Sequence, residues 1–502
     1  MANFKDYEIG QSLNLHIDFD EFLPAHHFAR KIEQLVSELD IEDILESYSP
    51  TGQKAYDPRM LLSIIFYGYM QGIRSGRKLA AACRTNLVFI YLSKCYRLGK
   101  STINDFRKNH YVHFESLFLQ VLQKCQDAGI VDPSVSIIDG SKIDANSSKK
   151  YSRTKGQFEK WQECLSRDIA ELEKEAIDSP TADVPARLAK KKLQKEKVDT
   201  LLSSFEGDDE GEKKNLTDVD APIMRTKKGG YDTAYNVQVG CTENQIITYA
   251  NVVTQGNDKA QLIPAAEGIK NNTGLPVEKV LADADYGSYD SLEYMAQENI
   301  KGYVPYRDMN IDVTDRPYHA ALFEYAADKD AYTCPQGETL IFKREVKSKG
   351  RVYRYYQTDA CKTCPVKDLC ISAKKAGRRV ISREVREPLR EEMKERLKSE
   401  EGKKMYLRRM HPVEAIFGHL KHNLGYTQFL LRGIEKVNAE FTLMCLAQNL
   451  RKLMMSLGGF LKNLLLWDLI RRQNGKTPDL SINFLKCENI ITHKLYSHVF
   501  SF

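Results

Sequence analysis

Three acidic residues that lie far apart in the chain are the strongest candidates for chemistry. Asp139 follows the apolar run SVSII, Asp283 follows KVLA, and Glu414 stands near the start of the amphipathic stretch HPVEAIFGHLKH. Carboxylate oxygens are hard ligands that suit Mg²⁺ or Mn²⁺. Two such ions, about 3.5 to 4 Å apart, activate an attacking oxygen and stabilise a leaving oxygen at phosphorus. We therefore predict that Asp139, Asp283 and Glu414 bind two Mg²⁺ or Mn²⁺ ions.

Each acid also has a purely structural interpretation. Asp139 is followed by a glycine, and an acid at the end of a strand commonly forms a turn. Glu414 lies two residues after Pro412, where an acid in the first turn of a helix interacts favourably with the helix dipole. Asp285 stands two residues after Asp283 and competes with it as a ligand. The apolar neighbours of Glu414 predict that it lies on the buried face of its helix, where an unpaired carboxylate is rare, and this favours metal binding.

Basic residues are concentrated in two blocks. Residues 59–109 contain ten Lys or Arg against one acid, and residues 341–390 contain fifteen basic residues against five acids, with three tyrosines among them. Lys and Arg side chains that neutralise DNA phosphates release counterions, so such blocks favour nucleic-acid binding. A solvated surface is the alternative explanation for any one block. The candidate DNA contacts in the first block are Arg74, Arg77, Lys78, Arg107 and Lys108.

Four of the eleven cysteines follow a metal-ligand pattern. Their spacing is C-x26-C-x2-C-x5-C, with turn-forming prolines in the same segments. Four thiolates at such spacing suit a tetrahedral structural zinc ion, which leaves no open position for catalysis. Four reduced thiols in a small β-rich insertion are the alternative. The residues concerned are Cys334, Cys361, Cys364 and Cys370.

The elements that must position these residues change along the chain. In the N-terminal region, GIRSGRKLAAAC, LVFIYLSKCY and STINDFRKNH indicate three short helices. They are compatible with a helix-turn-helix reader of DNA and equally with a plain helical bundle. From residue 134 the pattern changes to strands, at SVSII, AYNVQVG, QIITYANVVT and VEKVLADADYG. Two of these predicted strands therefore end at an acid, the first at Asp139 and the second at Asp283.

A charged segment interrupts these strands. Residues 157–177 and 186–203 are helical in pattern, which predicts a helical hairpin inserted at 152–215. The chain has no run of about 18 uncharged apolar residues, and its N-terminus lacks the build of a signal peptide. We therefore expect a cytoplasmic protein with reduced thiols and no membrane contact.

In its motifs the chain resembles the bacterial insertion-sequence transposases of the DDE type. YDPRMLL, GYMQGIRSGRKLAAAC and STINDFRKN are similar to their N-terminal DNA-binding region, and IIDGSKIDANSSK resembles the motif of the first Asp. The family motif A-D-x-G-Y reads ADADY here, with Asp285 at the usual glycine position. AYNVQ and FLLRG…CLAQNLRKL are also similar to family segments. Tyr406, Arg409, Glu414 and Lys421 match the family signature Y-x2-R…E-x6-K. Four residues separate Arg409 from Glu414 here, one more than in one widespread version of the signature.

The resemblance implies an α/β fold with an RNase H-like mixed sheet flanked by helices. An all-α DNA-binding domain would cover residues 1–130, the RNase H-like catalytic domain 131–460, and a C-terminal tail 461–502. The catalytic domain would carry the helical hairpin at 152–215 and a Cys-rich insertion, able to bind zinc, at 308–390.

The resemblance also implies an enzyme that recombines DNA. It would bind the terminal inverted repeats of its own mobile element, hydrolyse the phosphodiester at each end, and use the freed 3′-hydroxyl to attack target DNA. Asp139, Asp283 and Glu414 would hold the metal ions. Double-stranded DNA would be bound by a homodimer or higher multimer, because two ends must be held together, and the protein would associate with the nucleoid. The residues expected at the DNA end are Tyr406, Arg409 and Lys421.

Two other functions stay open on the sequence alone. One is a transposase-derived DNA-binding protein that has lost catalysis, against which the three acids argue. The other is an RNase H-like nuclease that cleaves DNA without joining it.

Overall fold

The computed structural model describes most of the chain. The described residues are 18–49, 51, 54–178, 182–205, 211–226, 229–306, 314–348, 350–371 and 377–474, with side chains described as far as residue 456. Residues 475–502 of the predicted tail, and parts of the predicted Cys-rich insertion, lie outside them. The chain divides into one unit, Met1–Lys452, and a second, Leu453–Phe502. Of the helices in the described ranges, none combines the length and hydropathy that a membrane span needs.

The N-terminal region is helical, as predicted. Its central helix is α4 (Pro58–Met70), which has Asp57 as N-cap and buries every residue except Arg59. The three short helices expected after it are α5 (Gly76–Thr85), α6 (Leu87–Leu92) and α7 (Lys100–Asn109). A Cβ at Gly76 would lie 2.3 Å from Asn104 Oδ1, so α5 and α7 approach at a distance that only glycine allows. The remaining helices of this region are α1 (Phe19–Phe22), α2 (Phe28–Ser37), α3 (Glu42–Glu46) and α8 (Phe114–Asp127).

The central sheet has an RNase H-like topology, as the resemblance implied. Its strands are β1 (Val135–Asp144), β4 (Ile223–Arg225), β5 (Tyr231–Cys241), β6 (Ile247–Val253), β7 (Lys279–Leu281) and β8 (Lys301–Tyr303). Their order is β4-β5-β1-β7-β8, and β6 also pairs with β5. β5 is antiparallel to both β1 and β6, whereas β1, β7 and β8 run parallel. The sheet thus has an antiparallel half, β6-β5-β1, and a parallel half, β1-β7-β8. Strand β1 belongs to both halves.

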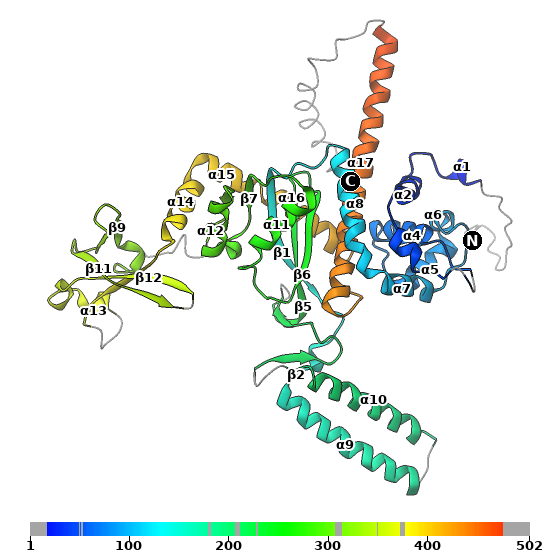
Figure 1. Cartoon of the computed structure of the whole chain (residues 1–502), viewed down its shortest axis with the longest axis horizontal. Helices are drawn as coiled ribbons and strands as arrows, with labels where there is room; N and C mark the ends of the chain where they lie inside the picture. The colour runs from blue at the N-terminus through cyan, green and yellow to red at the C-terminus, as the bar shows by residue number, and fades with distance from the viewer. Residues whose placement is uncertain are drawn as a thin grey trace, which may run out of the picture. The chain divides into compact units, whose positions relative to one another are not determined.

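Helices pack against this sheet (Figure 1). α11 (Leu262–Thr273) contacts β5, β6 and α8, and α12 (Tyr289–Gln297) connects β7 to β8. α16 (Met410–Gly418) packs against β1 and continues into a π-helical turn, His419–Asn423. The other helices of this half are α14 (Glu387–Lys398), α15 (Glu400–Leu407) and α17 (Ile434–Asn474).

Two insertions extend the catalytic fold, as expected for this fold class. In the helical hairpin, α9 (Lys155–Asp178) and α10 (Val184–Leu202) lie side by side (Figure 1). The hairpin starts and ends at two short paired strands, β2 (Ser152–Thr154) and β3 (Lys213–Asn215). The Cys-rich region forms an antiparallel sheet of order β13-β12-β11-β10-β9. Its elements are β9 (Glu324–Ala326), β10 (Ala331–Thr333), β11 (Thr339–Ser348), β12 (Arg351–Gln357), α13 (Lys367–Cys370) and β13 (Val380–Glu384).

A buried ion pair joins the N-terminal helices to the C-terminal segment. Arg74 Nη1 lies 2.7 Å from Oε1 of Glu440, whose side chain on α17 is fully buried. The same carboxylate accepts hydrogen bonds from the backbone N–H groups of Leu430 and Leu431, at 2.9 and 2.8 Å. The Arg74 guanidinium also lies 5.0 Å from the ring centre of Tyr426. Loss of either charged partner would leave a charge unpaired in a low-dielectric site.

Glu440→Gln should therefore destabilise the protein by about 3 to 5 kcal/mol, because the substitution leaves the Arg74 guanidinium without its counter-charge. Urea denaturation of the two proteins measures the difference. Glu298→Gln is the matched control, since Glu298 forms an exposed pair with Lys270 and should change stability by less than about 1 kcal/mol. Equal, small losses in both variants would show that the buried pair does not join the two regions.

Candidate active site

The register of β1 and β7 places two of the predicted acids side by side. Ile137 pairs with Leu281 in this parallel pair, and Asp139 and Asp283 each follow two residues later. Neighbouring strands lie about 4.8 Å apart, so the two carboxylates start at the same level of adjacent strands. Asp283 follows the last residue of β7, as predicted, whereas Asp139 lies inside β1, which continues to Asp144, so the strand end predicted at Asp139 is wrong. Asp283 also caps the short 3₁₀ turn Ala284–Tyr286 that follows it. The structure therefore brings Asp139 and Asp283 together.

Burial and nearby negative charge disfavour the ionised forms of both acids. Burial raises the pKa of Asp139 to about 6; the charge of Arg409 opposes this rise, and the charge of Asp283 adds to it. Burial likewise raises the pKa of Asp283, again with Arg409 in opposition. The carboxylate of Asp258 raises the pKa of both residues further. Negative charge that Arg409 only partly offsets is therefore concentrated at this pair, which suits a cation.

A network of polar side chains that the sequence did not predict packs beside the first acid. Gln238 pairs with Gly140 across β1 and β5 and donates through Nε2 to Asp258 Oδ1 at 2.7 Å. Asn236 donates to the same oxygen at 2.7 Å, and the hydroxyl of Tyr286 donates to Gln238 Oε1. A Cβ at position 140 would lie 2.6 Å from Gln238 Nε2 and 2.9 Å from Asp258 Oδ1. The network therefore ties the strand of the first acid to the turn of the second.

Only part of this network left a signal in the sequence. AYNVQ, residues 234–238, carries two amides on one face of a strand that is buried throughout, and buried strands are usually apolar. Asp258 in GNDKAQL looks like an ordinary residue at the start of a helix. Nothing near it in the sequence predicts a contact with position 140.

The predicted residues Tyr406 and Arg409 lie close enough to the acid pair to interact with it electrostatically. Burial raises the pKa of the Tyr406 hydroxyl, Arg409 opposes the rise, and Asp283 and Asp139 add to it. Arg409 stands between α15 and α16, and its Nε is buried without a hydrogen-bond partner among the described residues. A buried N–H without a partner is rare in proteins. This donor is therefore available to an anionic group that enters the site.

Lys421 joins the end of the α16 segment to β1. Its ammonium donates to Ser141 Oγ at 2.6 Å and to the backbone oxygen of Lys142 at 2.7 Å. The sequence predicted a phosphate contact for this residue, whereas in the structure its ammonium makes these protein contacts. Lys421 consequently fixes α16 close to the strand that carries the first acid.

Glu414 does not lie on the buried face of its helix, contrary to the sequence-based expectation. Its side chain is exposed, because α16 turns its apolar residues inward and position 414 falls on the other side. Asp258, rather than Glu414, is the third acid whose charge raises the pKa of both aspartates. The buried apolar residues of α16 are Pro412, Val413, Ile416 and Phe417.

Two of the predicted DNA contacts are engaged inside the fold instead. Arg74 holds Glu440, and Arg107 is buried, where it donates to Tyr69 Oη at 3.2 Å and to Asn104 Oδ1 at 2.7 Å. Neither guanidinium is presented on a surface that DNA can reach. The exposed members of the predicted set are Arg77, Lys78 and Lys108.

The four predicted zinc ligands line one small pocket. Its volume is ≈ 30 Å³, roughly the share of one water molecule in the liquid. All four sulfurs are free thiols. Burial raises the pKa of the Cys370 thiol, Arg379 opposes the rise, and the other three thiols add to it. The thiols therefore lie close enough together to interact.

Neither group of candidate ligands is drawn together tightly in this structure. In the described ranges, no three His, Cys, Asp or Glu side chains converge as they would around a metal ion. The chemistry of the donors nevertheless fits. The carboxylate oxygens of Asp139 and Asp283 match a hard divalent cation, and the four sulfurs match zinc.

Two family models match the chain. The one described as Transposase DDE domain matches residues 333–454, and the one described as Transposase domain (DUF772) matches residues 17–109. Both matches are to transposase domains, and together they support an insertion-sequence transposase of the DDE type. No curated protein matches this transposase. The first match spans the Cys pocket and the segment of Arg409 and Glu414, whereas Asp139 and Asp283 of the transposase lie outside both matched segments.

Removal of the first acid should stabilise the metal-free transposase. The pKa of Asp139 is about 6 in the folded state against 3.8 for the free group, so the folded state binds more protons between these values. The free energy of unfolding therefore falls as pH rises through that window. At pH 8 in EDTA, Asp139→Asn should raise stability by up to about 3 kcal/mol, measured as a higher melting temperature.

Asp328→Asn makes the same charge change at an exposed position and should leave the melting temperature nearly unchanged. Added Mg²⁺ should then raise the melting temperature of the wild type more than that of Asp139→Asn. A variant no more stable than the wild type at pH 8 would contradict the electrostatic account of the site.

Gly140→Ala should distort the polar network, because its Cβ meets Gln238 and Asp258. We expect a stability loss of about 1 to 3 kcal/mol and DNA cleavage well below the wild-type rate. Gly156→Ala is the control, since a Cβ there meets only Glu159 Oε2 at 4.0 Å. Thermal melting and a cleavage assay check both variants, and full activity in Gly140→Ala would show that the close approach is dispensable.

Proposed function

We propose that this transposase binds the terminal inverted repeats of its own insertion sequence, cleaves the phosphodiester at each end, and joins the freed 3′-hydroxyl to target DNA. The observation that carries this proposal is the pair of carboxylates: Asp139, inside β1, and Asp283, directly after β7, each lie two residues beyond the parallel pair Ile137↔Leu281. The match to a transposase DDE domain supports the same conclusion, because such transposases generally use divalent metal ions.

Asp139 and Asp283 would hold two Mg²⁺ or Mn²⁺ ions, and Glu414 would be the third acid by its place in the family signature. When bound, such ions polarise the phosphate and generate a nucleophilic oxygen at neutral pH. The concentration of partly buried negative charge on the two aspartates favours this assignment. The support for Glu414 is its place in the family signature, since α16 packs on β1 through its buried apolar residues and the Glu414 side chain is exposed.

Arg409 would bind the phosphate at the cut. Its Nε is a buried donor without a partner among the described residues, and a guanidinium suits bidentate contact with phosphate oxygens. Tyr406, one turn earlier, would pack beside the DNA end. Lys421 would act by holding α16 to β1, and its positive charge would still favour a nearby phosphate.

Recognition of the repeats would lie in the N-terminal helices. Arg77 and Lys78 on α5 and Lys108 on α7 are exposed cations on helices that pack together, and they suit the DNA backbone. Because two ends must be cut in concert, we propose that the active form is a dimer or larger assembly on DNA.

The thiol pocket would bind a structural zinc ion that fixes the Cys-rich sheet. Purified protein should then contain about one zinc per chain, and Cys361→Ser/Cys364→Ser should lose it and lower the melting temperature. Cys164→Ser, at an exposed position on α9, is the control and should keep the zinc. Elemental analysis together with thermal melting makes the measurement. Wild-type protein free of zinc after purification without chelators would refute this assignment.

The catalytic assignment predicts a clean separation of cleavage from binding. Asp139→Ala, Asp283→Ala and Glu414→Ala should each abolish cleavage and strand transfer in Mg²⁺, while affinity for the repeats stays within a few-fold of the wild type. Asp285→Ala is the control and should stay active. The assay uses DNA that carries the element's own ends.

Full activity in Glu414→Ala would remove this residue from the proposed site. Cleavage without joining in the wild type would indicate a nuclease instead. Loss of binding in all three variants would contradict the roles assigned to them.

A further inference from the structure

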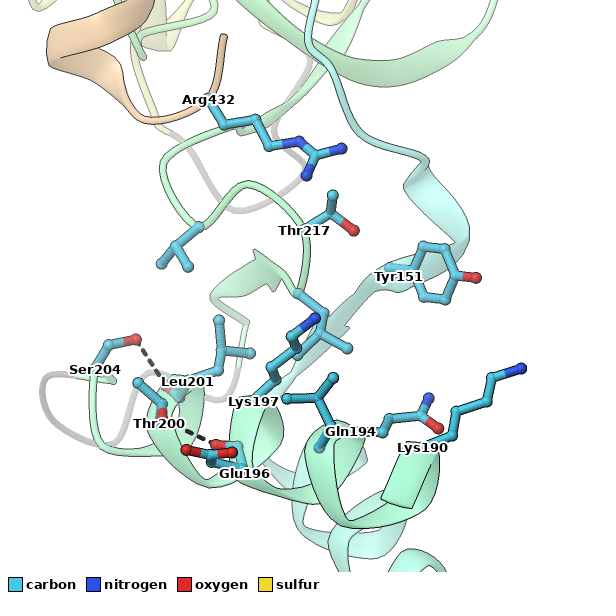
Figure 2. Close-up of a pocket in the computed structure, with 13 residues that line it drawn as sticks. Tyr151, Lys190, Gln194, Glu196, Lys197, Thr200, Leu201, Ser204, Thr217 and Arg432 are labelled. Carbon is cyan, nitrogen blue, oxygen red and sulfur yellow. Dashed lines mark hydrogen bonds between the residues drawn. The ribbon is translucent and has the colours of Figure 1, made fainter. Parts of the chain in front are cut away.

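A groove lies between α10 and the base of the helical hairpin (Figure 2). Its volume is ≈ 840 Å³. One wall comes from α10 and Ser204, and the other comes from Tyr151, Leu216, Thr217, Val219 and Arg432. None of its lining residues belongs to the acid pair, the polar network or the thiol pocket described above.

Large apolar side chains are exposed along this groove. Tyr151 is 45% exposed, Leu193 53% and Val219 43%, and all three line it. Scattered exposed apolar residues are ordinary, but several gathered in one hollow indicate a binding surface. Tyr151 offers a flat ring face on which a nucleic-acid base can stack.

Positive charge accompanies these apolar side chains. The charged residues that line the groove are three cations and one acid: Lys190, Lys197, Arg432 and Glu196. Lys190 and Lys197 are seven residues apart on α10, so they share one face of the helix about 10.5 Å apart along its axis. In Figure 2, Lys197 points from α10 toward the wall that carries Thr217 and Arg432. Arg432 is anchored there by its Nε, which donates to the backbone oxygen of Asn146 at 2.9 Å.

Two of the three lysines between Lys190 and Lys197 form ion pairs across the hairpin. Lys191 pairs with Asp168 at 2.5 Å and Lys192 with Glu173 at 2.7 Å, both on α9. Neither groove lysine has an ion-pair partner in the part of the chain that the structure describes. Charge is also divided between the two helices, since α10 has six basic residues and two acids, whereas α9 has four basic residues and seven acids. The hairpin therefore presents its basic helix to the groove.

We propose that this groove binds a DNA strand, with phosphates against Lys190, Lys197 and Arg432 and a base against the ring of Tyr151. A polyanion matches the excess of cations, and an unstacked base matches the exposed apolar surface between them. The proposal rests on the proposed function only in that DNA is the substrate. It assigns to the helical hairpin a second DNA contact, apart from the N-terminal helices.

The test compares two double variants that remove the same charge from the same helix. Lys190→Gln/Lys197→Gln alters the groove, and Lys191→Gln/Lys192→Gln alters the side that faces α9. Binding of the full-length protein to a fluorescent thymidine oligonucleotide is titrated by anisotropy over a range of salt concentrations. Each phosphate contact contributes about 0.7 to the slope of log affinity against log salt for single strands. The groove variant should therefore flatten this slope by about 1.4, and the control should leave it unchanged.

Tyr151→Leu provides an independent measurement. It should weaken binding of the oligonucleotide while leaving the salt slope unchanged, because it removes stacking and no charge. Equal slopes in the groove and control variants would overturn the groove assignment. Wild-type protein that binds neither this oligonucleotide nor duplex DNA would overturn the proposed function as well. The two failures are thus distinguishable.

Discussion

The parallel register of β1 and β7 is the constraint on which the rest of the site depends. It sets two carboxylates side by side, partly removed from water, where burial and neighbouring acids disfavour their ionised forms. Such an arrangement opposes folding, so neighbouring elements must hold it in place. Gln238 and Tyr286 brace it from β5 and from the turn after β7, and Arg409 supplies a nearby positive charge.

Gln428 and Phe429, which follow the α16 segment, contact the C-terminal end of β1. Asp144 forms a parallel β-bridge with Gln428, and the backbone N–H of Phe429 donates to the backbone oxygen of Asp144 at 2.9 Å. A few residues on, Glu440 receives Arg74 from the N-terminal helices. β1 is consequently where segments separated by hundreds of residues meet, and a change there acts on several regions at once.

The strands and the acid that follows β7 were accessible from sequence, because alternation and apolar runs are local properties. The hairpin and the Cys-rich insertion were accessible for the same reason. The predicted end of β1 at Asp139 was wrong, since the strand continues to Asp144 by pairing with β5. The interior roles of Arg74 and Arg107 were not accessible, since the neighbouring sequence does not reveal whether a basic side chain faces DNA or an interior partner. The partner of Arg74, Glu440, is 366 residues away. The exposure of Glu414 depends on which face α16 turns to β1. The part played by Asp258 depends on a loop that returns beside Gly140, and no local pattern encodes it.

The short β2–β3 pair has a consequence for how this chain can vary. Backbone pairing from Ser152↔Asn215 to Thr154↔Lys213 holds the two ends of the hairpin together, and Asn215 Nδ2 adds hydrogen bonds to Ser148 and Ser152. The entropy of closing a loop grows only slowly with its length. The segment between these strands can therefore lengthen, shorten or be exchanged between relatives while β1 and β5 keep their alignment. The hairpin is in this sense a replaceable module, whose exchange would leave Asp139 and Asp283 in place.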